Sequence, residues 1–226
     1  MNGMSQGLAG AVHGISVWAL PLLLAITLHE AAHGFAAFAL GDDTAKRMGR
    51  VSANPIRHID PFGTIVLPAM LLLQGGFMFG WAKPVPVDFG RLKPRRMGMV
   101  LVALAGPATN LAQAVVAAAL IHLALLAPPW IRDWAGENLF NAIRINLVLA
   151  VFNMLPLPPL DGGRVAVGLL PNVLARPLAS LERWGMLIIL VAFVALPYAG
   201  VNVFGWVVGL PASILRVWVF RLTGLA

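Results

Sequence analysis

Long apolar segments, separated by short polar stretches, make up most of this chain of 226 residues. A helix needs about 20 predominantly apolar residues to cross the hydrocarbon core of a bilayer, and several segments reach or approach that length. The segments cover residues 15–40, 64–81, 99–127, 139–155, 184–196 and 201–220. This pattern predicts an all-α, polytopic membrane protein that forms a single integral membrane domain over residues 1–226.

The segment at 64–81 is expected to differ from the others, because it is short and Gln74-Gly75-Gly76 interrupts it. If it spanned the membrane, the basic residues at 46–57 and those at 83–96 would lie on opposite faces. Cytoplasmic loops carry the excess of Lys and Arg, so one shared face is the better arrangement. We therefore predict about five to six transmembrane helices, with a re-entrant or membrane-associated hairpin after the first helix and a cytoplasmic carboxyl terminus.

Composition supports lipid as the main solvent. Hydrophobic residues make up 59% of the chain and charged residues 11%, whereas about a quarter of the residues in a soluble domain are charged. The net charge of +7 does not indicate nucleic-acid binding, because the basic residues lie in short stretches between apolar segments. The absence of cysteine excludes disulfides and thiolate-bound metal.

The first apolar segment contains His29, Glu30 and His33 in the order His-Glu-Ala-Ala-His. Residues four apart lie on one face of a helix, one turn above each other, so both imidazoles can reach one metal ion. Glu30 can take a proton from water, as in the metalloprotease pattern HExxH. Ionisable side chains inside a membrane helix are costly and by default mark a functional site. The alternative is that they pair with polar groups of neighbouring helices.

A catalytic zinc site has three protein ligands and one open position, so a third ligand must come from elsewhere in the chain. We single out Asp161, because it follows an apolar helix and the Pro-rich stretch at 156–159. Gly162-Gly163 after it allows the backbone to turn sharply. An Asp-Gly pair is also common in solvated turns, so spacing alone leaves both interpretations open.

Further polar residues lie within or near the apolar segments. Asn110 is expected either to bond across helices near the site or only to join helices by packing. Asn146 lies two turns before Asn153 on the same face, which favours bonding between helices. His58 lies in a basic stretch beside Asp60, and a direct role for it is not favoured.

Three motifs, in this order, resemble the site-2 protease family of intramembrane metalloproteases. They are the HExxH helix, GPxxN as Gly106-Pro107-Ala108-Thr109-Asn110, and NxxPxPPLDGG over residues 153–163. The chain is similar to the short form of the family, which carries no PDZ or CBS domain. It departs from many relatives in having no spanning helix before the HExxH helix and in carrying the extra apolar segment at 64–81.

The resemblance implies one zinc ion per chain, held by His29, His33 and Asp161, with Glu30 as the general base. It also implies that Asn153 helps to hold the substrate or to stabilise the oxyanion. The implied protein is an intramembrane zinc metalloendopeptidase of the cell membrane, with its active site towards the cytoplasmic side. Its expected partners are the lipid bilayer and a membrane-anchored protein substrate cut within or near its transmembrane helix.

Two other classes of function use the same residues. A membrane metalloprotease of the zincin type would take a downstream Glu as its third ligand, but Glu137 and Glu182 lie in no supporting motif. A catalytically inactive metal-binding scaffold or a transporter is the other alternative. A scaffold does not need the base Glu30, and a transporter more often shows paired repeats, which this sequence lacks.

Overall fold

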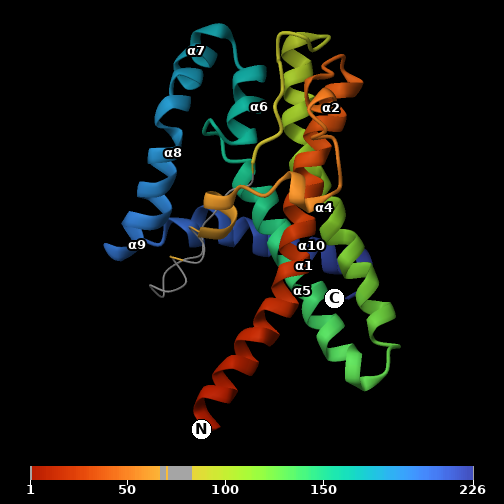
Figure 1. Ribbon diagram of the computed structural model, residues 1–226. Helices are drawn as coiled ribbons and strands as arrows, with labels where there is room; N and C mark the ends of the chain where they lie inside the picture. Colours follow the sequence, from red (N-terminus) through yellow and green to blue (C-terminus); the bar gives the residue numbers. More distant parts are fainter. Residues whose placement is uncertain (1, 67–69, 71–82, 226) are drawn as a thin grey trace.

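Three long helices form the centre of the molecule: α1 (Asn2–Ala39), α4 (Arg95–Ala124) and α5 (Pro129–Asn153) (Figure 1). The computed structural model describes residues 2–66, 70 and 83–225, and these residues contain helices, turns and loops but no strand. The prediction of an all-α protein is therefore confirmed. The prediction of one domain over residues 1–226 stays a prediction.

Shorter helical elements complete the described chain. After α1 come α2 (Thr44–Arg47), the 3-10 turn η1 (Pro55–Arg57) and the π-helical η2 (Pro61–Val66). After α5 come α6 (Asp161–Leu169), α7 (Asn172–Ser180), α8 (Glu182–Leu190), η3 (Val191–Ala195), α9 (Leu196–Tyr198), η4 (Gly205–Gly209) and α10 (Leu210–Thr223). The stretch at 42–63, between α1 and the apolar segment at 64–81, holds short helical turns.

Glycine and proline determine where the long helices begin and end. α1 stops before Gly41, whose φ of 101° lies in the left-handed region that glycine adopts without steric cost. α4 follows Pro94, and α5 begins at Pro129, where a missing backbone N–H costs nothing. α5 therefore starts well before the apolar segment at 139–155. Its polar first turns hide this start from a hydropathy pattern.

Small side chains allow α4 and α5 to pack closely. Ala114 and Ala118 of α4 are fully buried against Ile143 and Leu147 of α5, and Val219 of α10 belongs to the same core. Lipid tails are as apolar as these side chains, so close van der Waals packing, rather than exclusion of water, holds membrane helices together.

Among the described residues, three helices are long and apolar enough to cross a membrane: Val12–Ala39 within α1, Arg95–Ala124 (α4) and Gly205–Thr223, which joins η4 and α10. A fourth span results if Asn172–Ser180 and Glu182–Tyr198, which meet at 58°, form one bent span. Polar residues within α5 lower its hydropathy, so the helix predicted at 139–155 is not among these candidates. The predicted hairpin at 64–81 falls mostly on residues 67–69 and 71–82, which lie outside the described residues.

Large apolar side chains point outward along these helices. Examples are Leu20 and Leu24 on α1, Val116 and Leu120 on α4, and Trp218 on α10. A surface this apolar is unfavourable in water, whereas lipid solvates it without cost. With its several long apolar helices, the chain is a multi-pass membrane protein.

The two basic stretches that flank residues 64–81 lie together at the carboxyl-terminal end of α1 (Figure 1). The backbone N–H of Lys93 donates to the carbonyl of Leu40 at 2.9 Å, and Arg91 forms an ion pair with Asp43 at 3.0 Å. The chain thus leaves α1 and enters α4 at the same end of the bundle. This arrangement agrees with the charge argument for a shared face.

A fold-back after α5 places α6 in the bundle. The backbone N–H groups of Leu157 and Leu160 donate to the carbonyls of Leu155 and Leu157 at 2.7 and 2.9 Å, which turns the Pro-rich stretch back on itself. α6 then begins at Asp161 and packs against α4.

Gly162 and Gly163 lie inside α6 rather than in the sharp turn that their sequence favoured. A Cβ on Gly162 would overlap the backbone of Met154, and one on Gly163 would overlap the backbone of Pro158. These glycines are therefore needed for close approach between α6 and the preceding fold-back, not for an unusual φ.

We expect Gly163→Ala to destabilise the protein by about 1–3 kcal/mol, because the added methyl group must push α6 away from Pro158. Gly136→Ala is the matched control. Position 136 is inside α5 with nothing within 4 Å of an added Cβ, so alanine there should stabilise the helix by about 0.5–1 kcal/mol. Thermal unfolding in detergent measures both changes, and equal melting temperatures for the two variants would contradict this role of Gly163.

Asp42 ties the two basic stretches together. Its side chain is 0% exposed and accepts hydrogen bonds from the hydroxyl of Thr44 at 2.5 Å and from the backbone N–H groups of Thr44 and Asp88 at 3.0 and 2.7 Å. Burial alone would raise the pKa of Asp42. The donated hydrogen bonds outweigh it and hold the pKa below its ordinary value.

A lowered pKa means that the folded state favours the ionised carboxylate. The resulting stability is present above the unfolded pKa, about 3.9, and is lost as the pH falls through the folded value. We expect Asp42→Asn to lower the melting temperature at pH 7, and we expect this difference from wild type to shrink below about pH 4. Melting curves across this range measure the effect, and a difference that grew on acidification would contradict it.

Candidate metal centre

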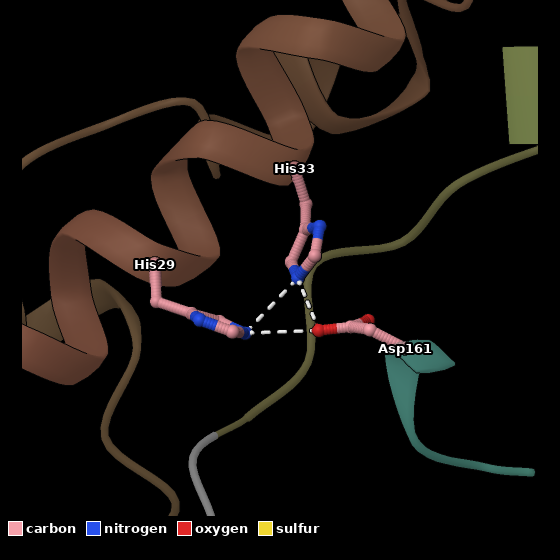
Figure 2. A group of neighbouring side chains, drawn as sticks. All are labelled: His29, His33 and Asp161. Carbon is pink, nitrogen blue, oxygen red and sulfur yellow. Dashed lines mark hydrogen bonds and ion pairs between the residues drawn. The ribbon is translucent and has the colours of Figure 1, made fainter. Parts of the chain in front are cut away.

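Two helices bring three ligand-type side chains together (Figure 2). α1 presents His29 and His33 one turn apart on the same face, and Asp161 faces them from the first turn of α6. The two Nε2 atoms are 3.1 Å apart, and Oδ2 of Asp161 lies 3.3 Å from each. The three residues are 6%, 9% and 6% exposed, so they form a nearly buried cluster.

Hydrogen bonds on the far side of each imidazole determine which nitrogen is available. Nδ1 of His29 lies 2.5 Å from Oδ1 of Asn110, and Nδ1 of His33 lies 2.7 Å from the carbonyl oxygen of Val102. Both partners are acceptors, so each Nδ1 carries the proton and each Nε2 keeps its lone pair. This is the usual arrangement of a metal-binding histidine, in which the second nitrogen donates to an oxygen.

The donor set fits a tetrahedral metal ion. Oδ2 of Asp161 is buried without a hydrogen-bond partner, although it faces two imidazole nitrogens. At metal–ligand distances of about 2.0–2.1 Å, ligand atoms at tetrahedral corners are about 3.3 Å apart, close to the separations found here. Three lone pairs that converge in this way repel one another unless a cation lies between them.

Gly106 of α4 leaves the space that an ion would need. A Cβ at this position would lie 2.5 Å from Nε2 of His33 and 2.6 Å from Nε2 of His29. Any side chain at 106 would therefore occupy the side of the cluster that faces α4.

The cluster opens into a cleft of about 390 Å³ between α1, α5, α6 and the segment at 84–89. The lining side chains are mostly apolar, with Glu30, Asn153 and Arg164 as the other polar groups beside the three ligand-type residues. A cleft with apolar walls and a few converging polar groups is typical of a binding site.

Glu30 lies at the cleft beside the cluster. Its Oε2 accepts a hydrogen bond from the backbone N–H of Val85 at 2.8 Å, across from the segment that leads to α4. A carboxylate has about four lone-pair sites, so this bond leaves Glu30 able to accept a proton.

Asn153 also lines the cleft, at the last turn of α5. Its Nδ2 donates to the carbonyl of Leu149, one turn back in the same helix, at 3.1 Å. The side chain thus reaches the cleft, but its amide N–H bonds within α5.

Other polar residues named from the sequence lie elsewhere or play supporting parts. Asn110 and Asn146 bond to each other across α4 and α5 at 2.7 Å, which confirms bonding between helices. Glu137, a ligand in the zincin alternative, pairs with His13 at 2.8 Å, away from the cluster. Nε2 of His58 donates to the carbonyl of Ser52, in the same loop, at 2.8 Å.

The sequence did not indicate four contributors to the site. They are Gly106, which leaves space beside the two imidazoles, the carbonyl of Val102, the amide of Val85 and the side chain of Arg164. Arg164 could have been found, because it lies three residues after Asp161 and so on the same face of α6. Gly106 was recognised only as part of a motif. The two backbone groups carry no signal in the residue types.

Residues 130–196 match the model of peptidase family M50. The chain is 41% identical over 179 residues to "Putative zinc metalloprotease YwhC" of Bacillus subtilis, which covers 77% of this chain and 78% of that protein. It is 31% identical over 174 residues to "Putative zinc metalloprotease Rip2" of Mycolicibacterium smegmatis, with 76% and 64% covered. The Rip2 protein of Mycobacterium tuberculosis is 29% identical over 204 residues, with 90% and 73% covered. No solved structure is significantly similar to the chain.

The relatives are named for zinc, and two imidazoles with one carboxylate are a common ligand set for a catalytic zinc. The described residues bring such a set together at one point, with Nε2 and carboxylate oxygen atoms within 4.8 Å of one another. The cofactor is therefore zinc.

We expect Gly106→Ala to abolish zinc binding, because its methyl group would occupy the space between the imidazoles. The matched control is Gly14→Ala on α1, where nothing lies within 4 Å of an added Cβ. Zinc content per chain after purification without chelators measures the effect. Full zinc content in Gly106→Ala would show that the ion does not use this space.

Proposed function

Because this chain belongs to peptidase family M50, the site-2 protease family of metalloproteases, we propose that it cleaves membrane-anchored proteins within or near their transmembrane helices. The proposed ligands of one zinc ion per chain are His29, His33 and Asp161. Glu30 is the proposed general base, and Asn153 is the proposed substrate or oxyanion contact.

The convergence of the three ligand-type atoms beside Glu30 is the observation that carries this proposal. A structural metal site would have four protein ligands, whereas a catalytic site has three and keeps one position open. In the described part of the chain the group comprises three residues, and it borders a cleft rather than being sealed by a fourth ligand.

Each residue then has a defined task in peptide hydrolysis. Zinc, when bound, supplies Lewis acidity that polarises a carbonyl and makes water more acidic. Glu30 accepts a proton from water and passes it to the leaving amine. Asn153 can contribute an N–H to the developing oxyanion if its side chain exchanges the Leu149 carbonyl for the substrate.

The cleft also restricts the form of the substrate. Its walls include the apolar side chains of Val85, Phe89, Phe152 and Ile189, which suit a segment taken from a membrane helix. The carbonyl and amide groups of a helix are already bonded to each other, so the substrate must unwind locally before a peptide bond can reach Glu30. Helix-breaking residues near the cleaved bond are therefore expected.

The proposed orientation places the site towards the cytoplasm. Leu40, at the end of α1, lies seven residues after His33, which corresponds to about 10 Å along a helix. The basic stretches that meet at this end are the ones that the positive-inside rule places in the cytoplasm. Water would reach the cleft from that side.

We expect Glu30→Gln to keep zinc and to lose about 10²–10⁴-fold in cleavage rate, because the amide cannot accept the proton. The measurement uses wild type and variant purified in detergent, zinc content per chain, and a panel of single-span membrane proteins as substrates. Asp161→Ala serves as the matched control, since it should lose zinc and cleavage together.

The outcomes separate protease from scaffold. Zinc in wild type and Glu30→Gln with cleavage by wild type alone supports the proposal. Zinc and equal cleavage in both proteins would remove Glu30 from the mechanism. Zinc in both without any cleavage of the panel would favour the metal-binding scaffold.

A further inference from the structure

The two imidazoles of the cluster are held by different kinds of acceptor. Nδ1 of His33 faces a backbone carbonyl, that of Val102, which no substitution removes. Nδ1 of His29 faces a side chain, Oδ1 of Asn110, at 2.5 Å. The proton position of His29 therefore depends on one replaceable residue of another helix.

Hydrogen bonds to backbone carbonyls fix the orientation of the Asn110 amide. Its Nδ2 donates to the carbonyl of Ala25 on α1 at 3.2 Å and to Oδ1 of Asn146 on α5 at 2.7 Å. Nδ2 of Asn146 in turn donates to the carbonyl of Ala142 at 2.9 Å. A carbonyl can only accept, so both amide NH₂ groups must point away from His29, and Oδ1 of Asn110 must point towards it.

Burial makes this chain of hydrogen bonds hard to replace by solvent. Asn110 is 0% exposed and Asn146 is 2% exposed. Without an acceptor at Nδ1, the proton of His29 would be drawn to the other side of the ring. Oδ2 of Asp161 lies 3.3 Å from Nε2 there and is a ready acceptor. A proton on Nε2 blocks the lone pair that a metal needs.

We infer that Asn110 is a positioning residue that keeps the proton of His29 on Nδ1, and that Asn146 keeps the Asn110 side chain in the required orientation. The inference rests on the proposed ligation of zinc by His29. The amide of Asn110 joins α1, α4 and α5 and also faces the imidazole of His29. Asn110 therefore both packs the helices together and controls the orientation of a metal ligand.

Two variants of Asn110 separate the positioning role from helix packing. Asn110→Leu keeps the branched shape of the side chain but removes the acceptor, and we expect zinc affinity to fall about 10–100-fold. Asn110→Asp keeps an acceptor oxygen towards Nδ1 of His29, so it should retain most of the affinity. Competition with a chromogenic chelator in detergent measures zinc affinity.

Asn138→Leu is the matched control. Asn138 is a buried asparagine like Asn110, but it lies in α5, and its amide donates to the carbonyl of Trp134 within the same helix. It should leave zinc affinity unchanged. Equal losses in Asn110→Leu and Asn138→Leu, or no loss in Asn110→Leu, would overturn the inference.

A spectroscopic measurement tests the proton itself. In zinc-free protein labelled with ¹⁵N-histidine, the ring signals of His29 are assigned by their loss in His29→Gln. Nδ1 should carry a proton in wild type and in Asn110→Asp, and should lack it in Asn110→Leu. A protonated Nδ1 in Asn110→Leu would overturn the inference. If wild type bound no zinc, the proposed function would fail by itself, while this spectrum would still decide the role of Asn110.

Discussion

Nε2 of His29, Nε2 of His33 and Oδ2 of Asp161 lie 3.1 to 3.3 Å apart in a nearly buried part of a membrane helix bundle. Polar atoms so placed cannot recover in lipid the hydration that they lose, and an unpaired buried polar group costs several kcal/mol. The surrounding structure is arranged to make this convergence tolerable. Acceptors hold the protons on the far side of both rings, and the near side is left to a cation.

Close approach of backbones is the second requirement, and glycine meets it at each point. Gly106 lets α4 pass the cluster without a side chain in the space for the ion. Gly162 and Gly163 let α6 pack directly on the fold-back that follows α5. The glycines of these sequence motifs are thus required for close packing between backbone segments, while other residues of the motifs supply the chemistry.

Much of the site could be predicted from the sequence, because the spacing of His29, Glu30 and His33 on one helix is a local property. Asp161 could be only a candidate, since its position depends on a fold-back that no periodicity encodes. The start of α5 at Pro129 could not be predicted from hydropathy, because its first turns contain proline and charged residues. Such residues can form a helix although they are not apolar. The amide of Val85 beside Glu30 could not be predicted, since backbone groups carry no residue-type signal.

The proposed ligands are divided between α1 and α6, which lie far apart in the sequence. A metal bound by both helices acts as a cross-link that closes a long loop through α4 and α5. An ion bound only by the folded protein adds its binding energy to folding, and that energy helps to offset the entropy lost when so long a loop is closed. The same ion would then serve both catalysis and stability. Removal of the metal would break the link between α6 and α1 and so would weaken the fold as well as the activity.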